Sequence, residues 1–155
     1  MCLHQMPVNK PRTVRVLIVE DEPMIALSLE DVLIDADFEV AGVVGKLEKA
    51  LALIESGACD AAIVDANLAG VSASPAAVAL AARGLPFIVI SGYSPEQMQG
   101  VFPGALFIQK PCRPELLIQT LNTLLLNRRT CGAEAALVRN KADAIRSKGD
   151  ADECC

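Results

Sequence analysis

The sequence has few aromatic residues: among 155 residues there is no tryptophan, one tyrosine and four phenylalanines. The core must therefore be packed mainly from Ala, Val, Leu and Ile, in a chain that is 52% apolar. This composition argues against an aromatic-rich all-β barrel and favours helices that cover a parallel sheet. The length is enough for one well-buried core and too short for two comfortable domains.

Cationic side chains are also scarce, because residues 13–127 hold 6 Lys/Arg against 14 Asp/Glu, a net charge of −8. Such a domain is a poor direct partner for nucleic acid. No apolar run approaches the length of a membrane span, and the N-terminus lacks the apolar core of a signal peptide. We therefore expect a cytoplasmic protein that binds neither nucleic acid nor membrane. The single histidine, His4, excludes a phosphohistidine relay within the domain.

Sequence patterns divide the chain into three segments. Residues 1–12 carry two prolines and no periodicity, which predicts a disordered leader. Residues 13–127 alternate apolar runs with segments of helical periodicity and form the predicted domain. Residues 128–155 are mixed and polar, and we expect a tail that is disordered or partly helical.

Five strands and five helices alternate in the predicted domain. The predicted strands are 14–19, 38–44, 61–65, 86–91 and 105–109. The predicted helices are one that begins at Pro23, then 46–55, 76–83 with Ser74 as a candidate cap, a weak one at 95–102, and 115–126. This alternation predicts an α/β fold in which a five-stranded parallel sheet carries helices on both faces.

Four of the predicted strands end on polar side chains. These ends are Glu20 with Asp21, then Asp65, Ser91 and Lys110. Because the carboxyl ends of parallel strands lie at one edge of a sheet, the topology predicts that these side chains converge there. This convergence is the strongest functional signal in the sequence.

The three carboxylates of this cluster require a cation, since two like charges about 4 Å apart repel by about 4 kcal/mol at an effective dielectric near 20. Oxygen ligands with room for water favour Mg²⁺. We expect Asp21 to bind it directly and Glu20 to bind it through water. Asp65 and the backbone carbonyl of Asn67 complete the predicted ligands.

Lys110 brings a positive charge to the same edge. With the metal, it would neutralise the oxygens of a phosphoryl group that moves in line onto the Asp65 carboxylate. The Ser91 hydroxyl would donate a hydrogen bond to the transferred group. The predicted product is an acyl phosphate on Asp65.

These residues, in this order and spacing, resemble those of the bacterial two-component response regulator receiver domain over about residues 13–127. The resemblance implies a flavodoxin-like (βα)5 fold and a phosphoprotein that receives its phosphoryl group from a sensor histidine kinase. It implies self-catalysed transfer and slow autodephosphorylation, so the protein is not expected to be a turnover enzyme. It also implies a cis Lys110–Pro111 bond and a switch formed by Ser91 and Phe107, although an aromatic residue in a strand is also a common core residue.

Residues 86–93 are similar to the Pro-Phe-x-Phe-Ala-Thr-Gly-Tyr signature of the FATGUY single-domain receivers. Val89, Ile90 and Ser91 replace Phe-Ala-Thr, whereas Gly92 and Tyr93 match. The similarity implies a kinase of the HWE or a related class and no attached output domain. Tyr93 either tunes the lifetime of the acyl phosphate or is a half-exposed loop residue.

Two other functions would also use a carboxylate at a strand end or a receiver-like fold. A phosphatase of the haloacid-dehalogenase type would need an acid two residues after Asp65, and Asn67 occupies that place. A receiver-like adaptor that works without phosphorylation would not need the full set of strand-end residues. The preferred prediction is a phosphoacceptor that signals, or drains phosphate, through protein contacts. The downstream partner and the existence of a homodimer stay open.

Overall fold

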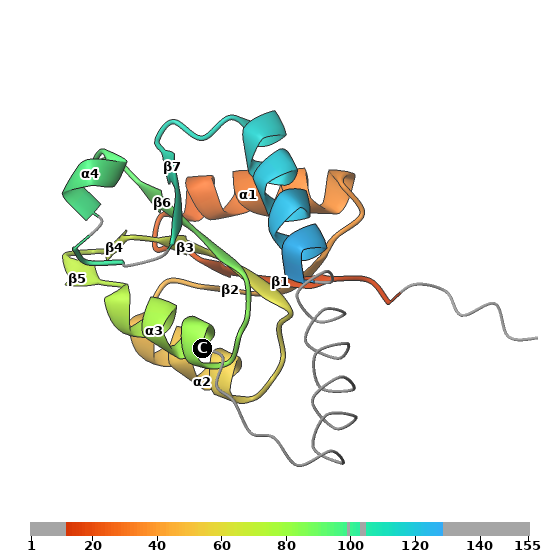
Figure 1. Cartoon of the computed structure of the whole chain (residues 1–155), viewed down its shortest axis with the longest axis horizontal. Helices are drawn as coiled ribbons and strands as arrows, with labels where there is room; N and C mark the ends of the chain where they lie inside the picture. Colours follow the sequence, from red (N-terminus) through yellow and green to blue (C-terminus); the bar gives the residue numbers. More distant parts are fainter. Residues whose placement is uncertain (1–11, 99, 103–104, 129–155) are drawn as a thin grey trace, which may run out of the picture.

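The computed structural model describes residues 12–98, 100–102 and 105–128, and their main element is a five-stranded parallel sheet (Figure 1). The strand order is β2-β1-β3-β6-β7, as expected for the flavodoxin-like receiver fold. The strands are β1 (Arg15–Val19), β2 (Glu39–Val44), β3 (Ala61–Asp65), β6 (Phe87–Ser91) and β7 (Leu106–Gln109). The predicted sheet is confirmed, with strand starts that differ by about one residue.

Helices cover both faces of this sheet, which confirms the second part of the fold prediction (Figure 1). One face packs against α1 (Pro23–Asp35) and the helix at 114–128. The other face packs against α2 (Leu47–Glu55) and α3 (Ser74–Ala82). The short α4 (Pro95–Met98) follows β6, and Phe102 after it is buried in the core of the second face.

The central strand β3 is buried along its whole length, Asp65 included. A strand covered on both faces needs apolar side chains at consecutive positions, which explains the run from Ala61 to Val64. In the register of β3 with β6, Asp65 lies opposite Ile90. The carboxylate therefore sits one residue short of the end of the neighbouring strand, at the carboxyl edge of the sheet.

A small hairpin, absent from the sequence prediction, follows Asp65. It consists of β4 (Asn67–Leu68) and β5 (Val71–Ser72), joined by Ala69 at φ 52° and Gly70 at φ 89°. Two turn residues with positive φ are typical of a two-residue hairpin, for which Asn-Gly is the usual sequence signal. Ala69 occupies the first turn position, so the signal was missing. The Asn67 side chain supports the turn, since its Oδ1 accepts a hydrogen bond from Gly70 N at 2.7 Å.

The predicted cap at Ser74 is wrong. Helix α3 begins at Ser74 itself, with Ala73 in the capping position and no side-chain cap. The Ser74 hydroxyl instead donates to the Val101 carbonyl at 3.2 Å, so a tertiary contact replaces the local one. The predicted leader and tail lie outside the described residues, except for Arg12 and for Arg128, which still belongs to the helix at 114–128.

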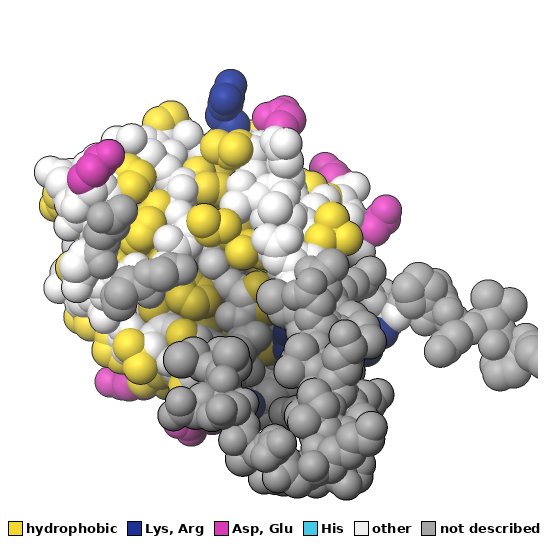
Figure 2. All heavy atoms as spheres, viewed as in Figure 1, with side chains coloured by type: hydrophobic (Ala, Val, Ile, Leu, Met, Phe, Trp, Pro, Cys, Tyr) yellow, Lys and Arg dark blue, Asp and Glu magenta, His cyan; other side chains and the backbone are white. Residues whose placement is uncertain are grey.

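Acidic side chains are spread around the rim of the face in Figure 2, although Glu20 and Asp65 are buried. Cationic side chains are few on that face, in keeping with the net −8 of residues 13–127. Within the described ranges no helix has both the length and the apolar character needed to cross a membrane.

Candidate functional site

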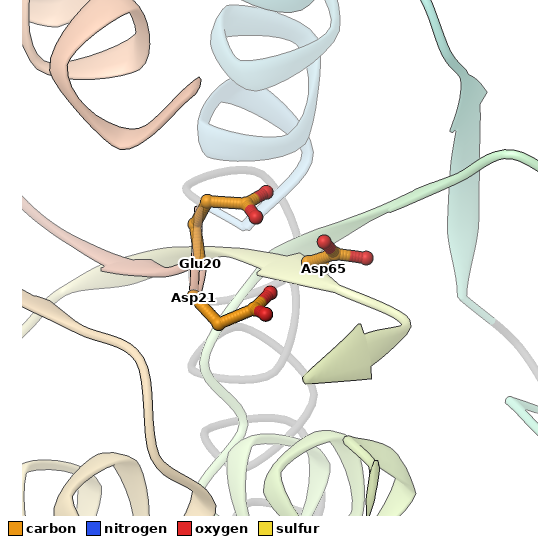
Figure 3. A group of neighbouring side chains, drawn as sticks. All are labelled: Glu20, Asp21 and Asp65. Atoms are coloured by element: carbon orange, nitrogen blue, oxygen red, sulfur yellow. The ribbon is translucent and has the colours of Figure 1, made fainter. Parts of the chain in front are cut away.

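Three carboxylates meet at the carboxyl edge of the sheet, as the sequence predicts (Figure 3). Glu20 and Asp21 follow β1 directly, and Asp65 is the last residue of β3, the neighbouring strand. One oxygen from each carboxylate lies within 4.8 Å of the others. Glu20 and Asp65 are buried, with 4% and 6% of their surface exposed, whereas Asp21 is exposed. The cluster is thus open to solvent on the side of Asp21.

The Lys110 side chain brings its positive charge to this edge of the sheet, as the sequence predicts. It follows β7, which is separated from β3 by β6, and its side chain reaches across to Asp65. Its Nζ donates to Asp65 Oδ2 at 2.9 Å and lies 3.6 Å from Glu20 Oε2. Burial opposes the charged amine, but the hydrogen bond to Asp65 and the negative charges of Asp65 and Glu20 raise the pKa of Lys110. The Lys110–Pro111 peptide bond is cis, as the family resemblance implied.

Glu20 has one oxygen that lacks a hydrogen-bond partner. Its Oε1 accepts from the Glu22 backbone N–H at 3.1 Å, whereas Oε2 is buried and receives no hydrogen bond from any described residue. Burial, with the nearby charge of Asp65, raises the pKa of Glu20 to about 7, although the Glu22 N–H acts in the opposite direction. A buried oxygen that accepts no hydrogen bond, in an all-oxygen cluster, fits a hard cation such as Mg²⁺.

The raised pKa of Glu20 predicts a pH dependence of stability in the metal-free protein. Folding raises the pKa from 4.5 to about 7, so the folded state binds the proton more tightly than the unfolded state does. This contribution to stability is complete below the unfolded pKa and is lost as the pH rises through about 7. Relative to Glu20→Gln, the free energy of unfolding of the wild type in chelator should fall by about 1–3 kcal/mol between about pH 5 and 8. Urea unfolding of both proteins measures it, and parallel pH profiles would contradict it.

Asp65 is held on both of its oxygens. Oδ1 accepts from the Asn67 backbone N–H at 3.1 Å, and Oδ2 accepts from Lys110. These two contacts fix the carboxylate at the end of β3. The Asn67 side chain is engaged in the hairpin turn, and the predicted role of its carbonyl as a metal ligand stays a prediction.

The remaining predicted residues surround this cluster. Ser91 ends β6, is buried, and accepts a hydrogen bond on Oγ from Tyr93 N at 3.0 Å, while Tyr93 itself is exposed. Phe107 lies half-buried on β7 and makes an edge-to-face contact with Phe102, with ring centroids 6.1 Å apart. The switch role of Ser91 and Phe107 and the rate-tuning role of Tyr93 stay predictions.

Sequence reasoning missed how closely the end of β2 approaches the acids. The Glu20 backbone N–H donates to the Val44 carbonyl at 2.9 Å, and a Cβ at Gly45 would lie 3.1 Å from the Asp21 Cα. A side chain at this position would crowd the Asp21 backbone, which glycine avoids. The glycine that closes the predicted second strand was the available signal, and it places Lys46 beside the site.

Comparison with protein families decides the membership of the chain. Residues 16–122 match the model of the response regulator receiver domain, which is well over half of the sequence. The chain belongs to this family. Receiver domains are signalling domains of response regulators, which supports a phosphoacceptor role for the site. A search of curated proteins gives no significant match.

Solved structures, response regulators among them, share the fold. SdrG from Sphingomonas melonis Fr1 is 41% identical, covers 73% of this chain and 97% of its own, and superimposes with a TM-score of 0.64. A response regulator receiver protein from Sinorhizobium medicae WSM419 is 26% identical, with coverages of 77% and 99% and a TM-score of 0.69. The response regulator PhyR from Brucella abortus is 26% identical and reaches 0.71, but the match covers 80% of this chain and 52% of PhyR. The predicted receiver is confirmed, and the FATGUY subfamily stays a prediction.

Proposed function

We propose that this receiver accepts a phosphoryl group on Asp65 from a sensor histidine kinase and passes the signal on through protein contacts. The observation that carries the proposal is the buried Asp65 carboxylate, which accepts a hydrogen bond from Lys110 Nζ at 2.9 Å and lies in a cluster with Glu20 and Asp21. A fixed cation beside a carboxylate at a strand end suits transfer of an anionic group.

In the proposed step, an Asp65 carboxylate oxygen attacks the phosphorus atom of the donor. The bond between phosphorus and the leaving group breaks, the leaving group takes the electron pair, and an acyl phosphate forms on Asp65. The Lys110 ammonium would balance the charge on the phosphoryl oxygens, and the Ser91 hydroxyl would donate a hydrogen bond to one of them. Because Ser91 Oγ accepts its hydrogen bond from Tyr93 N, the hydroxyl proton of Ser91 is free to be donated to the phosphoryl group.

Glu20, Asp21 and Asp65, with the Asn67 carbonyl, would hold Mg²⁺. The three carboxylates and the buried Glu20 oxygen that accepts no hydrogen bond support this assignment. When bound, Mg²⁺ supplies electrostatic stabilisation of the phosphoryl oxygens.

We further assign the readout of phosphorylation to Ser91 and Phe107. Phe107 packs against Phe102, which follows α4. A movement of Phe107 would therefore change the surface formed by α4 and β7. Tyr93 would then limit the access of water to the acyl phosphate, whose slow autodephosphorylation ends the signal. The exposure of the Tyr93 side chain, two residues from Ser91, supports this proposal.

The similarity of residues 86–93 to the FATGUY signature supports three narrower assignments. These are a kinase of the HWE or a related class, a cytoplasmic receiver without an output domain, and signalling or phosphate drainage through a protein partner. Phosphotransfer profiling against the kinases of the source organism tests the kinase class directly. Transfer only from kinases outside the HWE and related classes would overturn that assignment.

The proposed function predicts that acetyl phosphate with Mg²⁺ adds one phosphoryl group per chain. Intact-mass spectrometry should show this single addition. Chelation removes Mg²⁺ and Asp21→Asn removes one of its candidate ligands, so either change should slow labelling by roughly 10²-fold or more. Asp37→Asn, which precedes β2 at the opposite edge of the sheet, serves as the control and should retain labelling. Labelling at the same rate in chelator would contradict the Mg²⁺ site.

A further inference from the structure

A large cleft opens next to the acidic cluster, on the side of Asp21. It has a volume of about 770 Å³ and lies between the start of α2 and the β4–β5 hairpin. Its lining includes Asp21, Gly45, Lys46, Lys49, Leu68 and Ala69. Since Asp21 is the exposed member of the acidic cluster, the cleft is a solvent path that ends at the site.

The backbone keeps Lys46 close to this end of the cleft. Gly45 packs directly on the Asp21 backbone, where a Cβ would be 3.1 Å from the Asp21 Cα. Lys46 is the next residue and Lys49 lies in the first turn of α2. Both lysines are therefore anchored to the rim of the site by the pairing of β1 with β2.

These two lysines have no ion pair or hydrogen bond from their side chains within the described ranges. Most other described cations are engaged: Arg12 and Arg15 with Asp60, Arg83 with the Glu55 carbonyl, Lys110 with Asp65 and Glu20, and Arg128 with the Asp60 carbonyl. The acids that share the cleft are Asp21, a candidate metal ligand, and the exposed Glu48. With Asp21 balanced by a metal ion, the cleft is a cationic patch in a domain of net charge −8.

A second cleft reaches the site from the other side and differs in character. It measures about 540 Å³ and is lined mainly by apolar side chains, among them Met24, Ile25, Leu29 and Ile90. Its only cation, Lys110, already contacts Asp65 and Glu20. Of these two clefts, the one lined by Lys46 and Lys49 is therefore the one that offers an approaching anion a lysine without an ion pair.

We propose that Lys46 and Lys49 steer anionic phosphodonors along this cleft to Asp65, an inference that rests on the proposed function of the site. An acidic domain repels a dianion, and two lysines without ion pairs in this cleft offset the repulsion along the path to Asp65. Such steering acts on the rate of encounter and weakens as salt shortens the range of the field, from about 30 Å at 0.01 M to about 3 Å at 1 M. Both lysines would act on the approach of the donor and would not touch the reacting atoms.

Single-charge variants test the proposal with acetyl phosphate as the probe and Mg²⁺ at saturation. Lys46→Gln and Lys49→Gln should each lower the second-order rate constant of labelling by about 2- to 5-fold at low ionic strength, and the loss should vanish near 1 M salt. Glu48→Gln should raise the rate constant, because it removes a negative charge from the same cleft. Arg12→Gln is the matched control. Arg12 pairs with Asp60, which precedes β3, whereas Asp65 ends this strand. The length of the strand, roughly 16 Å, therefore separates Asp60 from Asp65.

A second measurement separates steering from an effect on the metal. Removal of a nearby cation should leave Mg²⁺ affinity equal or slightly higher, so slower labelling with undiminished Mg²⁺ binding supports steering. Equal rate constants for Lys46→Gln, Lys49→Gln and Arg12→Gln, or a loss that persists at high salt, would overturn the inference. In that case a labelled wild type would still support the proposed function, whereas an unlabelled wild type would overturn the function itself.

Discussion

Asp65→Asn is expected to abolish phosphorylation by acetyl phosphate and by any kinase. The amide keeps the size of the side chain, and its oxygen can still accept the hydrogen bond from the Asn67 N–H. It lacks the anionic oxygen that forms the bond to phosphorus, so the rate should fall by at least about 10³-fold. Intact-mass spectrometry after incubation with acetyl phosphate and Mg²⁺ measures the loss.

Asp37→Asn is the matched control for this variant. Asp37 has a φ of 64°, which asparagine also tolerates, and it precedes β2 at the opposite edge of the sheet from the site. The control should be labelled at the wild-type rate, which would show that replacing an aspartate elsewhere in the domain does not abolish labelling. Labelling that persists in Asp65→Asn at another residue would refute the assignment of the acceptor.

The convergence of Glu20, Asp65, Ser91 and Lys110 could be predicted from sequence because it follows from topology alone. Apolar runs marked the strands, helical periodicity marked the crossovers, and a parallel sheet places all strand ends at one edge. No contact between side chains had to be known. The core positions of β3 were predictable for the same reason, since a strand covered on both faces is apolar throughout.

Features that depend on tertiary contacts were not predictable. The hairpin at Asn67–Ser72 places Ala69 in a left-handed conformation, which its residue type disfavours, and only surrounding structure can impose it. Ser74 has the sequence of a cap, yet its hydroxyl donates to Val101, 27 residues away. Burial of Glu20 raises its pKa, and burial is a property of the packed sheet and not of the local sequence.

Lys110 should matter for stability as well as for chemistry. Among the described residues, Lys110 is the one cation that forms ion pairs with the buried carboxylates of Asp65 and Glu20. Lys110→Met fills a similar volume but leaves both acids without this cation, and loss of one partner from a buried ion pair is destabilising. In chelator we expect the free energy of unfolding to fall by about 1–3 kcal/mol, and labelling with Mg²⁺ to slow by roughly 10²-fold. Urea unfolding and intact-mass spectrometry measure the two effects.

Two further variants separate charge from geometry at this position. Lys110→Arg keeps the positive charge, so it should recover most of the stability. Its planar guanidinium is not equivalent to the compact amine that contacts Asp65 at 2.9 Å, so labelling should stay slow.

Combining Lys110→Met with Asp65→Asn removes one carboxylate together with the cation, and the double variant should be more stable than the sum of the two single changes predicts. Mg²⁺ should also restore stability to Lys110→Met, because it binds the acids that lost their cation. Strict additivity, with no gain from Mg²⁺, would show that Lys110 does not balance the charge of this cluster.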